Sequence, residues 1–244
     1  MGAAADASPA ASQRVAVVTG GAGAIGGAIA VALAAAGHTV VSLDQAPVSQ
    51  NTVPPVDLGS DEQVRAAAAA VLGRHGRCDV LVHAAAAFGQ AGLADLDLTA
   101  WRRVQAVNVE AALLLAQAFV PGMAERGFGR IVFIVSDTVW SPPAGDMLPY
   151  VTSKGALIAL ARTLAVGHGR DGIAVTCVAP GLTDTPTARA GQPATLFDDV
   201  RSRQALPRTL VPGDVAATVA FLASDGAAAL TGQTLCVDGG LVLR

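Results

Sequence analysis

Charged residues are scarce in this sequence, and neither sign dominates. Lys and Arg number 16, Asp and Glu number 19, and together they make up 14% of the 244 residues. The formal net charge of -3 gives no basic surface that would bind a phosphate backbone, so we expect no nucleic-acid partner. Hydrophobic residues reach 52%, which indicates elements that are buried on more than one side.

Cysteine and histidine are also few, and they are scattered. Three cysteines lie far apart, which excludes a disulfide framework and is typical of thiols in a reducing compartment. They are Cys78, Cys177 and Cys236. The four histidines stand alone, so no spacing predicts a metal site. We expect a cytoplasmic protein that uses no metal.

A long hydrophobic run is missing as well. The longest strongly apolar stretch, at 111–120, has about half the length of a membrane-spanning helix. The first residues carry no Lys or Arg and lack the apolar stretch of a secretory signal. We expect residues 1–12 to form a flexible tail, residues 13–244 to form a single domain, and no association with a membrane.

Short runs rich in Val and Ile alternate with longer Ala-rich stretches along the whole domain. This alternation predicts an α/β fold, a doubly wound Rossmann fold whose parallel sheet of about seven strands has helices on both faces. Apolar runs place strands at 14–19, 39–44, 78–84, 130–136, 173–179 and 233–239. Helices are predicted at 24–36, 61–73, 100–126, 150–168 and 213–223. Segment 182–211 is predicted to be a long loop that acts as a lid over the substrate.

The glycine-rich segment TGGAGAIG, at 19–26, follows the first predicted strand and opens the first helix. Gly20 permits a tight turn, and small residues let the backbone approach a pyrophosphate, whose charge is favoured by amides at the start of a helix. The segment therefore predicts a dinucleotide-binding turn, with a plain strand-to-helix turn as the alternative. Its cofactor-binding candidates are Gly20, Gly23, Ala24, Ile25 and Gly26.

Asp44 ends the second predicted strand, 18 residues beyond Gly26. A carboxylate there can accept both hydroxyls of the adenosine ribose and would repel a 2′-phosphate. No Lys or Arg lies at 20–30 or 45–50 to attract that phosphate. Asp44 thus predicts NAD rather than NADP, although an ordinary solvated residue at a strand end is the alternative.

Tyr150 and Lys154 lie four residues apart at the start of a predicted helix, so they share one face. A phenol has an unperturbed pKa of about 10, and a nearby ammonium favours the phenolate and lowers that pKa. The pair therefore predicts a proton-transfer group that works near neutral pH. The same spacing often occurs by chance, so the pair gains meaning only from the motifs around it.

Those motifs stand in a characteristic order. They are VHAAA at 82–86, VNVEAA around Asn108, Ser136 at a strand end, YVTSK at 150–154, PGLTDT at 180–185 and the terminal GQTLCVDGG. With the glycine turn, Asp44, Asp57 and Leu58, the chain resembles the short, single-domain branch of the short-chain dehydrogenases/reductases over residues 13–244. The resemblance implies an NAD-dependent oxidoreductase that moves a hydride between NAD(H) and a secondary alcohol or ketone.

The resemblance also implies a role for each site residue. Tyr150 would exchange a proton with the substrate oxygen, and Lys154 would lower the Tyr150 pKa while holding the nicotinamide ribose. Ser136 would bond the same oxygen, and Asn108 would complete a water-linked proton relay. Further cofactor contacts would come from Asp57, Leu58, Ala84, Ala85, Tyr150, Lys154, Pro180, Gly181, Thr183 and Thr185. Taken alone, Ser136 could simply end a strand, Asn108 could bond backbone inside a helix, and 180–185 could be a Pro-Gly turn.

The sequence departs from the family pattern at three places. Ala24 replaces a usual glycine, and residues 83–86 read HAAA where N-N-A-G is usual, which adds methyl groups beside the dinucleotide. Ser136 and Tyr150 lie fourteen positions apart, one more than usual. We interpret His83 as a structural histidine rather than a proton donor. The glycine spacing also fits the longer branch that acts on nucleotide sugars, but the chain length and PGLTDT argue against it.

The substrate-binding candidates are Ser136, Trp140, Tyr150 and Leu182, with Trp140 equally acceptable as a packing residue. Their apolar surroundings favour a hydrophobic or aromatic secondary alcohol, similar to the 1-phenylethanol type. The alternatives are a 3-oxoacyl-thioester reductase, a dehydrogenase of cyclic diols or sugars, and a non-catalytic dinucleotide sensor or scaffold. The resemblance further implies a homotetramer in which helices 100–126 and 150–168 pair between subunits.

Overall fold

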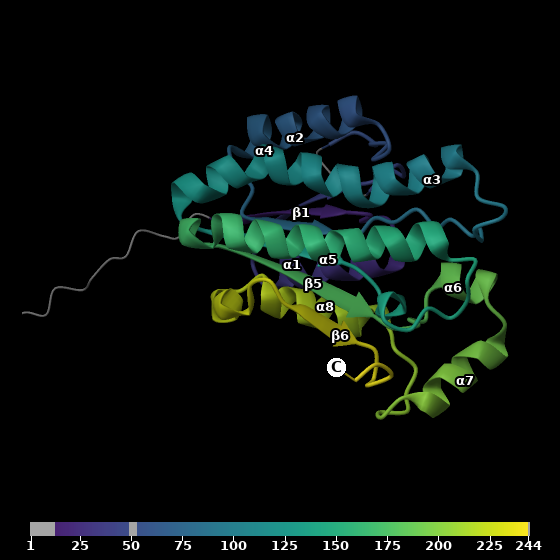
Figure 1. Cartoon of the computed structure of the whole chain (residues 1–244). Helices are drawn as coiled ribbons and strands as arrows, with labels where there is room; N and C mark the ends of the chain where they lie inside the picture. Colours follow the sequence, from purple (N-terminus) through teal and green to yellow (C-terminus); the bar gives the residue numbers. More distant parts are fainter. Residues whose placement is uncertain (1–12, 49–52, 244) are drawn as a thin grey trace, which may run out of the picture.

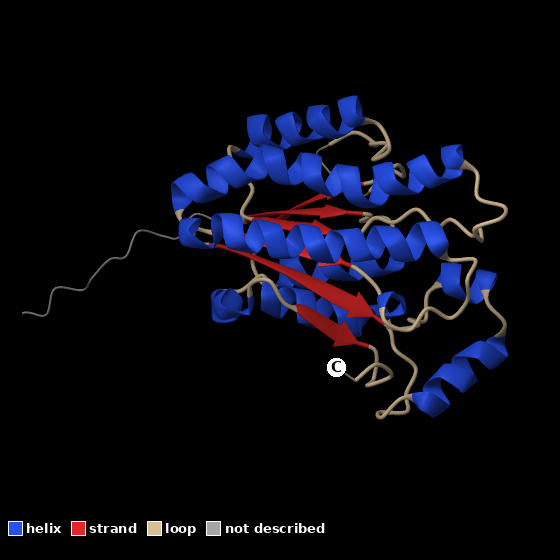
Figure 2. Cartoon of the chain, in the orientation of Figure 1, coloured by secondary structure: helices blue, strands red, loops and turns tan. Residues whose placement is uncertain are grey.

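A six-stranded parallel sheet runs through the centre of the molecule (Figures 1 and 2). The computed structural model describes residues 13–48 and 53–243, so the tail expected at 1–12 lies outside the described residues. The strand order is β2-β1-β3-β4-β5-β6, and every neighbouring pair is parallel. The strands are β1 (Val15–Thr19), β2 (Thr39–Leu43), β3 (Val80–His83), β4 (Gly129–Ile134), β5 (Ile173–Pro180) and β6 (Thr234–Val237).

Helices cover both faces of the sheet, which is why the inner strands are apolar throughout. One face carries α2 (Asp61–His75), α3 (Leu98–Gln105), α4 (Ala111–Arg126) and α5 (Leu148–His168), and the other carries α1 (Ala24–Ala35) and α8 (Pro212–Leu222). A hydrophobic cluster fills the space on each face, one with Leu115 and Phe119, the other with Ile29 and Val219. The predicted doubly wound Rossmann fold is confirmed.

The sheet has six strands within the described residues, not the predicted seven or so. In the described part of the segment after β2, Val56 N bonds Asp44 O at the sheet edge, at 2.8 Å. Pro54 and Pro55 precede it and have no N–H to donate, so a ladder cannot extend along this edge. Prolines therefore explain the missing strand.

The predicted helix at 100–126 forms, but it is not regular. A π-helical turn, Ala106–Glu110, separates α3 from α4, and Ala111 N bonds Ala106 O across it. By length and composition, the continuous helix Leu98–Arg126 could cross a membrane. However, 56% of its apolar 18-residue stretch is buried inside the fold. This burial is what a core helix shows, because the helix packs on the sheet.

The lid predicted as a loop at 182–211 contains two helices, α6 (Pro186–Gly191) and α7 (Ala194–Arg203). Both follow the rule that proline is tolerated where a helix begins: Pro186 opens α6, and Pro193 is the N-cap of α7. Residues that indicated a loop thus start helices instead. Short 3-10 turns lie at Asp137–Val139, Gly169–Asp171 and Asp225–Leu230.

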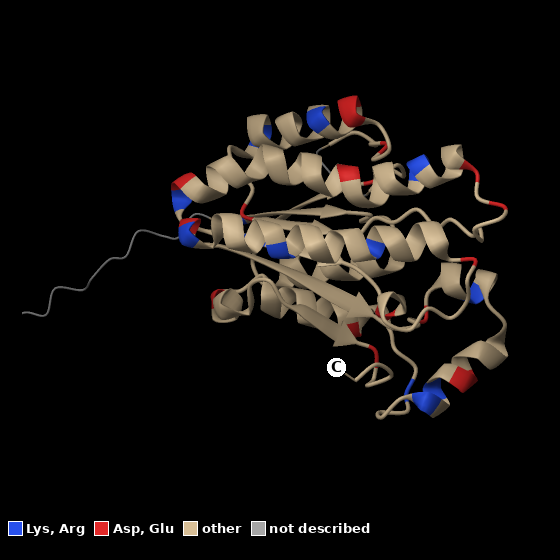
Figure 3. Ribbon diagram, viewed as in Figure 1, with Lys and Arg blue, Asp and Glu red and all other residues tan. Residues whose placement is uncertain are grey.

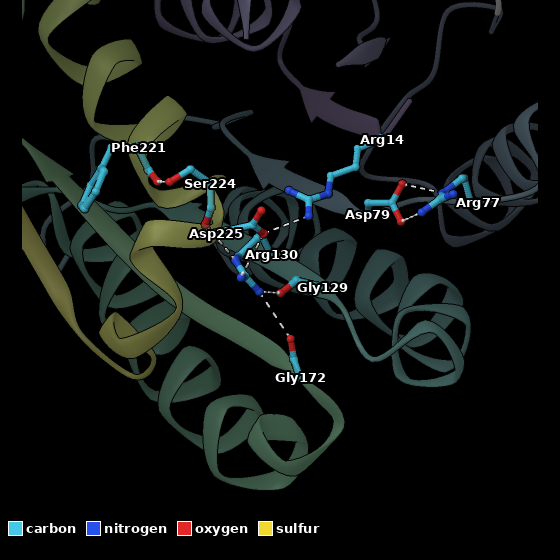
Figure 4. Close-up of polar contacts among 9 residues, drawn as sticks. All are labelled: Arg14, Arg77, Asp79, Gly129, Arg130, Gly172, Phe221, Ser224 and Asp225. Atoms are coloured by element: carbon cyan, nitrogen blue, oxygen red, sulfur yellow. Dashed lines mark hydrogen bonds and ion pairs between the residues drawn. The ribbon is translucent and has the colours of Figure 1, made fainter. Parts of the chain in front are cut away.

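The positions of Lys, Arg, Asp and Glu are spread along the ribbon, with several on α2 and α7 (Figure 3). A distinct polar cluster lies near the amino ends of the strands (Figure 4). Asp79 accepts both a bidentate bond from Arg77, at 2.7 and 2.8 Å, and the Val15 amide at 2.9 Å. Arg130 donates to carbonyls of Ser224, Gly129 and Gly172. These bonds tie loops from distant parts of the sequence to the start of the sheet.

Candidate active site

The predicted site residues follow the carboxyl ends of the strands. Because all strands are parallel, these ends meet at one edge of the sheet, where open α/β folds bind their ligands. The turn after β1, the segment 84–87 after β3, Ser136 after β4 and Gly181 after β5 all lie along this edge. The sequence motifs are thus brought together from four separate connections.

The glycine turn has the shape that a pyrophosphate needs. Gly20 has φ 73°, and a Cβ there would lie 2.9 Å from Ala85 Cα. A Cβ at Gly26 would collide with the carbonyl of Gly20. Gly23 caps α1 without any side-chain bond, so the first amides of the helix have no side-chain acceptor. Ala24 is exposed, so its methyl group is not packed inside the turn.

Asp44 is held beside this turn. One carboxylate oxygen accepts the amide of Ala22 at 3.0 Å, and the other accepts the amide of Ala46 at 3.0 Å. Each oxygen keeps a further lone pair for a hydroxyl group. The arrangement fits a ribose with two free hydroxyls, because a phosphate there would meet a carboxylate charge.

Asp57 has a partner that the sequence did not indicate. Arg103, on α3, donates to its two carboxylate oxygens at 2.8 and 3.1 Å, and the Gln45 amide adds a bond at 2.9 Å. The hydrogen bond from Arg103 is the main cause that lowers the pKa of Asp57 to about 2. Leu58, the next residue, is buried. The carboxylate is therefore fixed and ionised beside Gln45, the residue that follows Asp44.

Ser136, Tyr150 and Lys154 come together at the end of β4. Tyr150 and Lys154 lie one turn apart on α5, with exposures of 8% and 1%. Ser136 lies near the Tyr150 phenol and acts to lower its pKa, and Lys154 Nζ donates to Ile134 O at 2.8 Å. Residues 141–146, between Ser136 and Tyr150, are exposed, so a loop of variable length fits there.

The pKa of Tyr150 differs from the sequence expectation. Burial raises it to about 12, against the opposing bond from Ser136, and the charge of Asp137 raises it further. The predicted lowering by Lys154 does not occur in the chain alone, because its ammonium lies 5.5 Å from the ring centroid and is bonded to a backbone carbonyl. Burial lowers the pKa of Lys154 itself to about 8. At neutral pH the phenol is therefore protonated and ready to donate.

Asn108 is fully buried in the π-helical turn. Its side chain accepts the Ala87 amide at 2.7 Å, and donates to the Ala87 carbonyl at 3.0 Å and to Ser153 Oγ at 2.9 Å. Asn108 thus bonds backbone groups, as its alternative interpretation held. The water-linked relay stays a prediction.

The segments after β3 and β5 also reach this edge. The amides of Ala84 and Ala85 both donate to Thr19 Oγ1 at 3.1 Å. At Gly181, which follows Pro180, a Cβ would lie 2.9 Å from Asp238 Cβ, so only glycine fits. The dinucleotide cradle therefore continues from the glycine turn across the ends of β3 and β5.

The two predicted threonines are already engaged. Thr183 donates its hydroxyl hydrogen to Gly181 O at 3.0 Å, and Thr185 accepts the Ala188 amide as N-cap of α6. The Thr185 hydroxyl hydrogen stays available for a cofactor group, whereas that of Thr183 has an acceptor inside the protein.

The predicted substrate contacts separate into two kinds. Leu182 lines a small hollow together with Phe197, Val200 and Leu210, and all the residues that line this hollow belong to segment 182–211. Trp140 is half-buried and packs against the core, as its alternative interpretation held. The sequence candidates left out Asp137, which is buried beside Ser136.

Phe88 gives the site an aromatic surface. Its ring is stacked on that of Tyr150 with centroids 4.8 Å apart, yet the residue is 66% exposed. A large apolar side chain that is both exposed and in contact with a buried phenol is suited to meet an apolar ligand. Among the described residues, no group of His, Cys, Asp and Glu has the arrangement of a metal site.

This geometry defines a class: an enzyme of the Rossmann type with a dinucleotide turn and a buried Ser-Tyr-Lys set at one edge of the sheet. The family model described as enoyl-(acyl carrier protein) reductase matches residues 20–242. The chain belongs to the short-chain dehydrogenase/reductase family, whose members are oxidoreductases that use a nicotinamide dinucleotide.

Individual relatives agree with this assignment. The chain is 35% identical to the cis-4-hydroxycyclohexanecarboxylate dehydrogenase of Sinomonas cyclohexanicum, over 93% of this chain and 96% of that protein. It is 36% identical to a probable short-chain type dehydrogenase/reductase of Bradyrhizobium diazoefficiens, over 94% and 87%. The crystal structure of TT0495 protein from Thermus thermophilus superposes with a TM-score of 0.88 at 36% identity, over 93% and 98%.

Proposed function

We propose that this protein is an NAD-dependent dehydrogenase that interconverts an apolar or aromatic secondary alcohol and its ketone. The observation that carries the proposal is the buried set of Ser136, Tyr150 and Lys154 at the same sheet edge as the glycine turn and Asp44. The dinucleotide, when bound, supplies the hydride chemistry. The protein supplies position, a proton and a site from which water is excluded.

Tyr150 supplies the proton in ketone reduction. Its phenol is protonated at neutral pH because burial raises its pKa to about 12, so it is ready to donate a proton to a ketone oxygen. Ser136, buried at the end of β4, is the residue that would bind the same oxygen. Lys154 is anchored by Ile134 O and keeps a positive charge beside the reaction at neutral pH, with a pKa of about 8.

The choice of NAD rests on Asp44. Its two oxygens are held by the amides of Ala22 and Ala46, which fixes the carboxylate where a 2′-phosphate would be repelled. A fluorescence titration with NADH and NADPH tests this choice. We expect tighter binding of NADH, and a smaller difference in Asp44→Ala. Tighter binding of NADPH by the unmodified protein would contradict the assignment.

The substrate class rests on Phe88, which places an exposed aromatic ring against that of Tyr150. The Sinomonas relative acts, by its name, on a hydroxyl group carried by a cyclohexane ring, which supports a cyclic or aromatic secondary alcohol. A screen of such alcohols with NAD at neutral pH, where Lys154 is charged, tests the class. Turnover of only sugars or linear polar alcohols would refute it.

The role of Tyr150 is tested by Tyr150→Phe. Loss of the proton-transfer group should lower turnover by about 10² to 10⁴-fold while NADH binding changes little. Thr152→Ala is a matched control on the same helix, because its hydroxyl only bonds Leu148 O at an exposed position. Full turnover in Tyr150→Phe would sink the catalytic assignment.

A second candidate is a 3-oxoacyl-thioester reductase, whose substrates are acyl thioesters, like those of the enoyl-(acyl carrier protein) reductase that the family model names. A 3-oxoacyl-thioester reductase would reduce acetoacetyl thioesters at the same Tyr150. A non-catalytic sensor would bind NADH tightly but turn over neither thioesters nor alcohols. Parallel assays with both substrate types separate the three functions.

We further propose a cytoplasmic homotetramer that has neither a nucleic-acid nor a membrane partner. The exposed apolar residues Leu113 on α4 and Val166 on α5 support pairing of these helices between subunits. Light scattering after size exclusion tests the assembly, and a monomer at micromolar concentration would refute it.

A further inference from the structure

His83 lies where three elements meet. It ends β3, it is fully buried, and its ring reaches both β1 and the π-helical turn. Nδ1 lies 3.0 Å from Thr19 Oγ1, and Nε2 lies 3.1 Å from Asn108 O. The ring therefore bridges the residue that precedes the glycine turn and the turn that carries Asn108.

The direction of each bond follows from counting protons. Thr19 Oγ1 already accepts the amides of Ala84 and Ala85, so its single hydrogen is left for His83 Nδ1. Nδ1 is then the acceptor, and Nε2–H donates to Asn108 O. The ring stays neutral throughout this network, because burial, with the charge of Lys154, lowers the pKa of His83 to about 3.

The network continues from Asn108 to the catalytic helix. Asn108 Nδ2 donates to Ser153 Oγ at 2.9 Å, and Ser153 Oγ donates to Tyr150 O at 2.6 Å. Ser153 is fully buried between Tyr150 and Lys154 in the sequence of α5. Direct hydrogen bonds thus run from the start of the glycine turn to the backbone of the catalytic tyrosine.

We propose that His83 is a positioning residue that couples the glycine turn to the catalytic helix through Asn108 and Ser153. The proposal rests on the proposed function and deepens it. Every member of the network is buried, so a displaced donor or acceptor would lose its partner without water to replace it. A shift of Thr19 on binding the dinucleotide would therefore move the Asn108 carbonyl and the first turn of α5 together.

A double-mutant cycle tests this coupling. Thr19→Val removes the hydroxyl at one end of the network, and Ser153→Ala removes the hydroxyl at the other. We expect their effects on kcat to deviate from additivity by about 5-fold in the native background and to be additive in His83→Phe. Additive effects on kcat in the native background would overturn the proposal.

Variants of His83 itself separate positioning from mere packing. His83→Asn keeps an oxygen near the place of Nδ1 but removes the donor to Asn108, whereas His83→Gln extends an amide towards the place of Nε2. We expect kcat to fall about 10-fold in His83→Asn and to be restored at least in part in His83→Gln, with NADH affinity nearly constant in both. Equal kcat values in the two variants would contradict the proposal, and His75→Asn on α2, outside the network, is the control.

The two hypotheses fail in different ways. If the native protein neither binds a nicotinamide dinucleotide nor turns over an alcohol or ketone, the proposed function is wrong. If it does both and the cycle on kcat is additive, the proposed function stands and the coupling role of His83 is wrong. If Thr19→Val does not fold, the comparison of His83→Asn with His83→Gln decides the question alone.

Discussion

Two aspartates are buried at opposite ends of the sheet. Asp79 precedes β3 at the amino end, and Asp137 follows β4 at the carboxyl end, with exposures of 0% and 7%. Burial is the largest influence on the pKa of both, and it acts to raise each one. The pKa of Asp79 is nevertheless lowered, whereas that of Asp137 is raised to about 6.

The partners explain the difference. Bonds from Arg77 and the Val15 amide, with the charge of Arg126, outweigh the burial of Asp79. Asp137 instead faces the charge of Asp238, which adds to its burial, and its bond with Ser136 at 3.4 Å is long. The buried carboxylate at the amino end of the sheet, which stabilises the fold, is therefore paired with arginines. The buried carboxylate at the carboxyl end, which carries the candidate active site, is repelled by a second carboxylate.

The largest effect on stability should come from removing Asp79, the carboxylate that is paired at the amino end of the sheet. Asp79→Ala leaves Arg77, Arg126 and the Val15 amide without their acceptor and should lower the free energy of unfolding by about 3 kcal/mol. Denaturant unfolding at pH 7 measures the loss, with Asp79→Asn as the milder control. NADH binding should persist in the folded fraction, because the site lies at the other end. A loss of less than about 1 kcal/mol would contradict the comparison.

Removing the charge of Asp137 should change the free energy of unfolding in the opposite direction. A raised folded-state pKa means that Asp137 contributes stability at low pH that is lost as pH rises through about 6. Asp137→Asn avoids this loss and should raise the free energy of unfolding by an amount on the order of 2 kcal/mol at pH 8, with no gain near pH 3. Unfolding curves at both pH values measure it. An equal effect at both would show that the charge is not the cause.

Lys154 sharpens the comparison at the catalytic end. Burial lowers its pKa to about 8, and its charge is needed beside the reaction, so ketone reduction should decline above pH 8 by about tenfold per unit. The pH profile of kcat measures the decline. Lys154→Arg stays charged at high pH, so any activity it keeps should not decline there. A flat native profile from pH 7 to 10 would refute this role.

The smallest effect is expected on the lid. Arg201 pairs with Asp198 on α7 at 2.9 Å, but both side chains are largely exposed. Arg201→Ala should change the free energy of unfolding by less than about 1 kcal/mol at any pH from 6 to 9. Thermal unfolding at two salt concentrations checks this. A larger loss would mean that exposed pairs matter here as much as the buried bonds of Asp79.

The sequence predicted those parts of the site that depend on local spacing. Gly20, Gly23 and Gly26 sit in a strand-to-helix turn, and Tyr150 and Lys154 sit one turn apart, because each pattern encodes its own geometry. The doubly wound fold was predictable for the same reason, since buried parallel strands must be apolar on both faces. These features need no knowledge of distant neighbours.

What the sequence missed depends on contacts between distant segments. Arg103 meets Asp57 across 46 residues, and the environment of Asp137 depends on Asp238 at the far end of the chain. The pKa of Tyr150 was misjudged because proximity in a helix says nothing about burial or about the carbonyl of Ile134 that holds Lys154. Segment 182–211 was predicted to be a loop, but Pro186 opens α6 and Pro193 is the N-cap of α7, because proline occurs both in loops and at helix starts.

The π-helical turn at Ala106–Glu110 sets the rotational phase of α3 relative to α4. Its wider ring amounts to one residue inserted into a regular helix, and each residue of an α-helix turns by about 100° and rises by about 1.5 Å. Deleting a single residue here would straighten the helix and swing α3 around its axis by roughly a quarter of a turn. Arg103 would then face away from Asp57, and Asn108 would lose its alignment with the loop at Ala87. The one extra residue of the π-helical turn thus orients both Arg103 and Asn108 toward their partners.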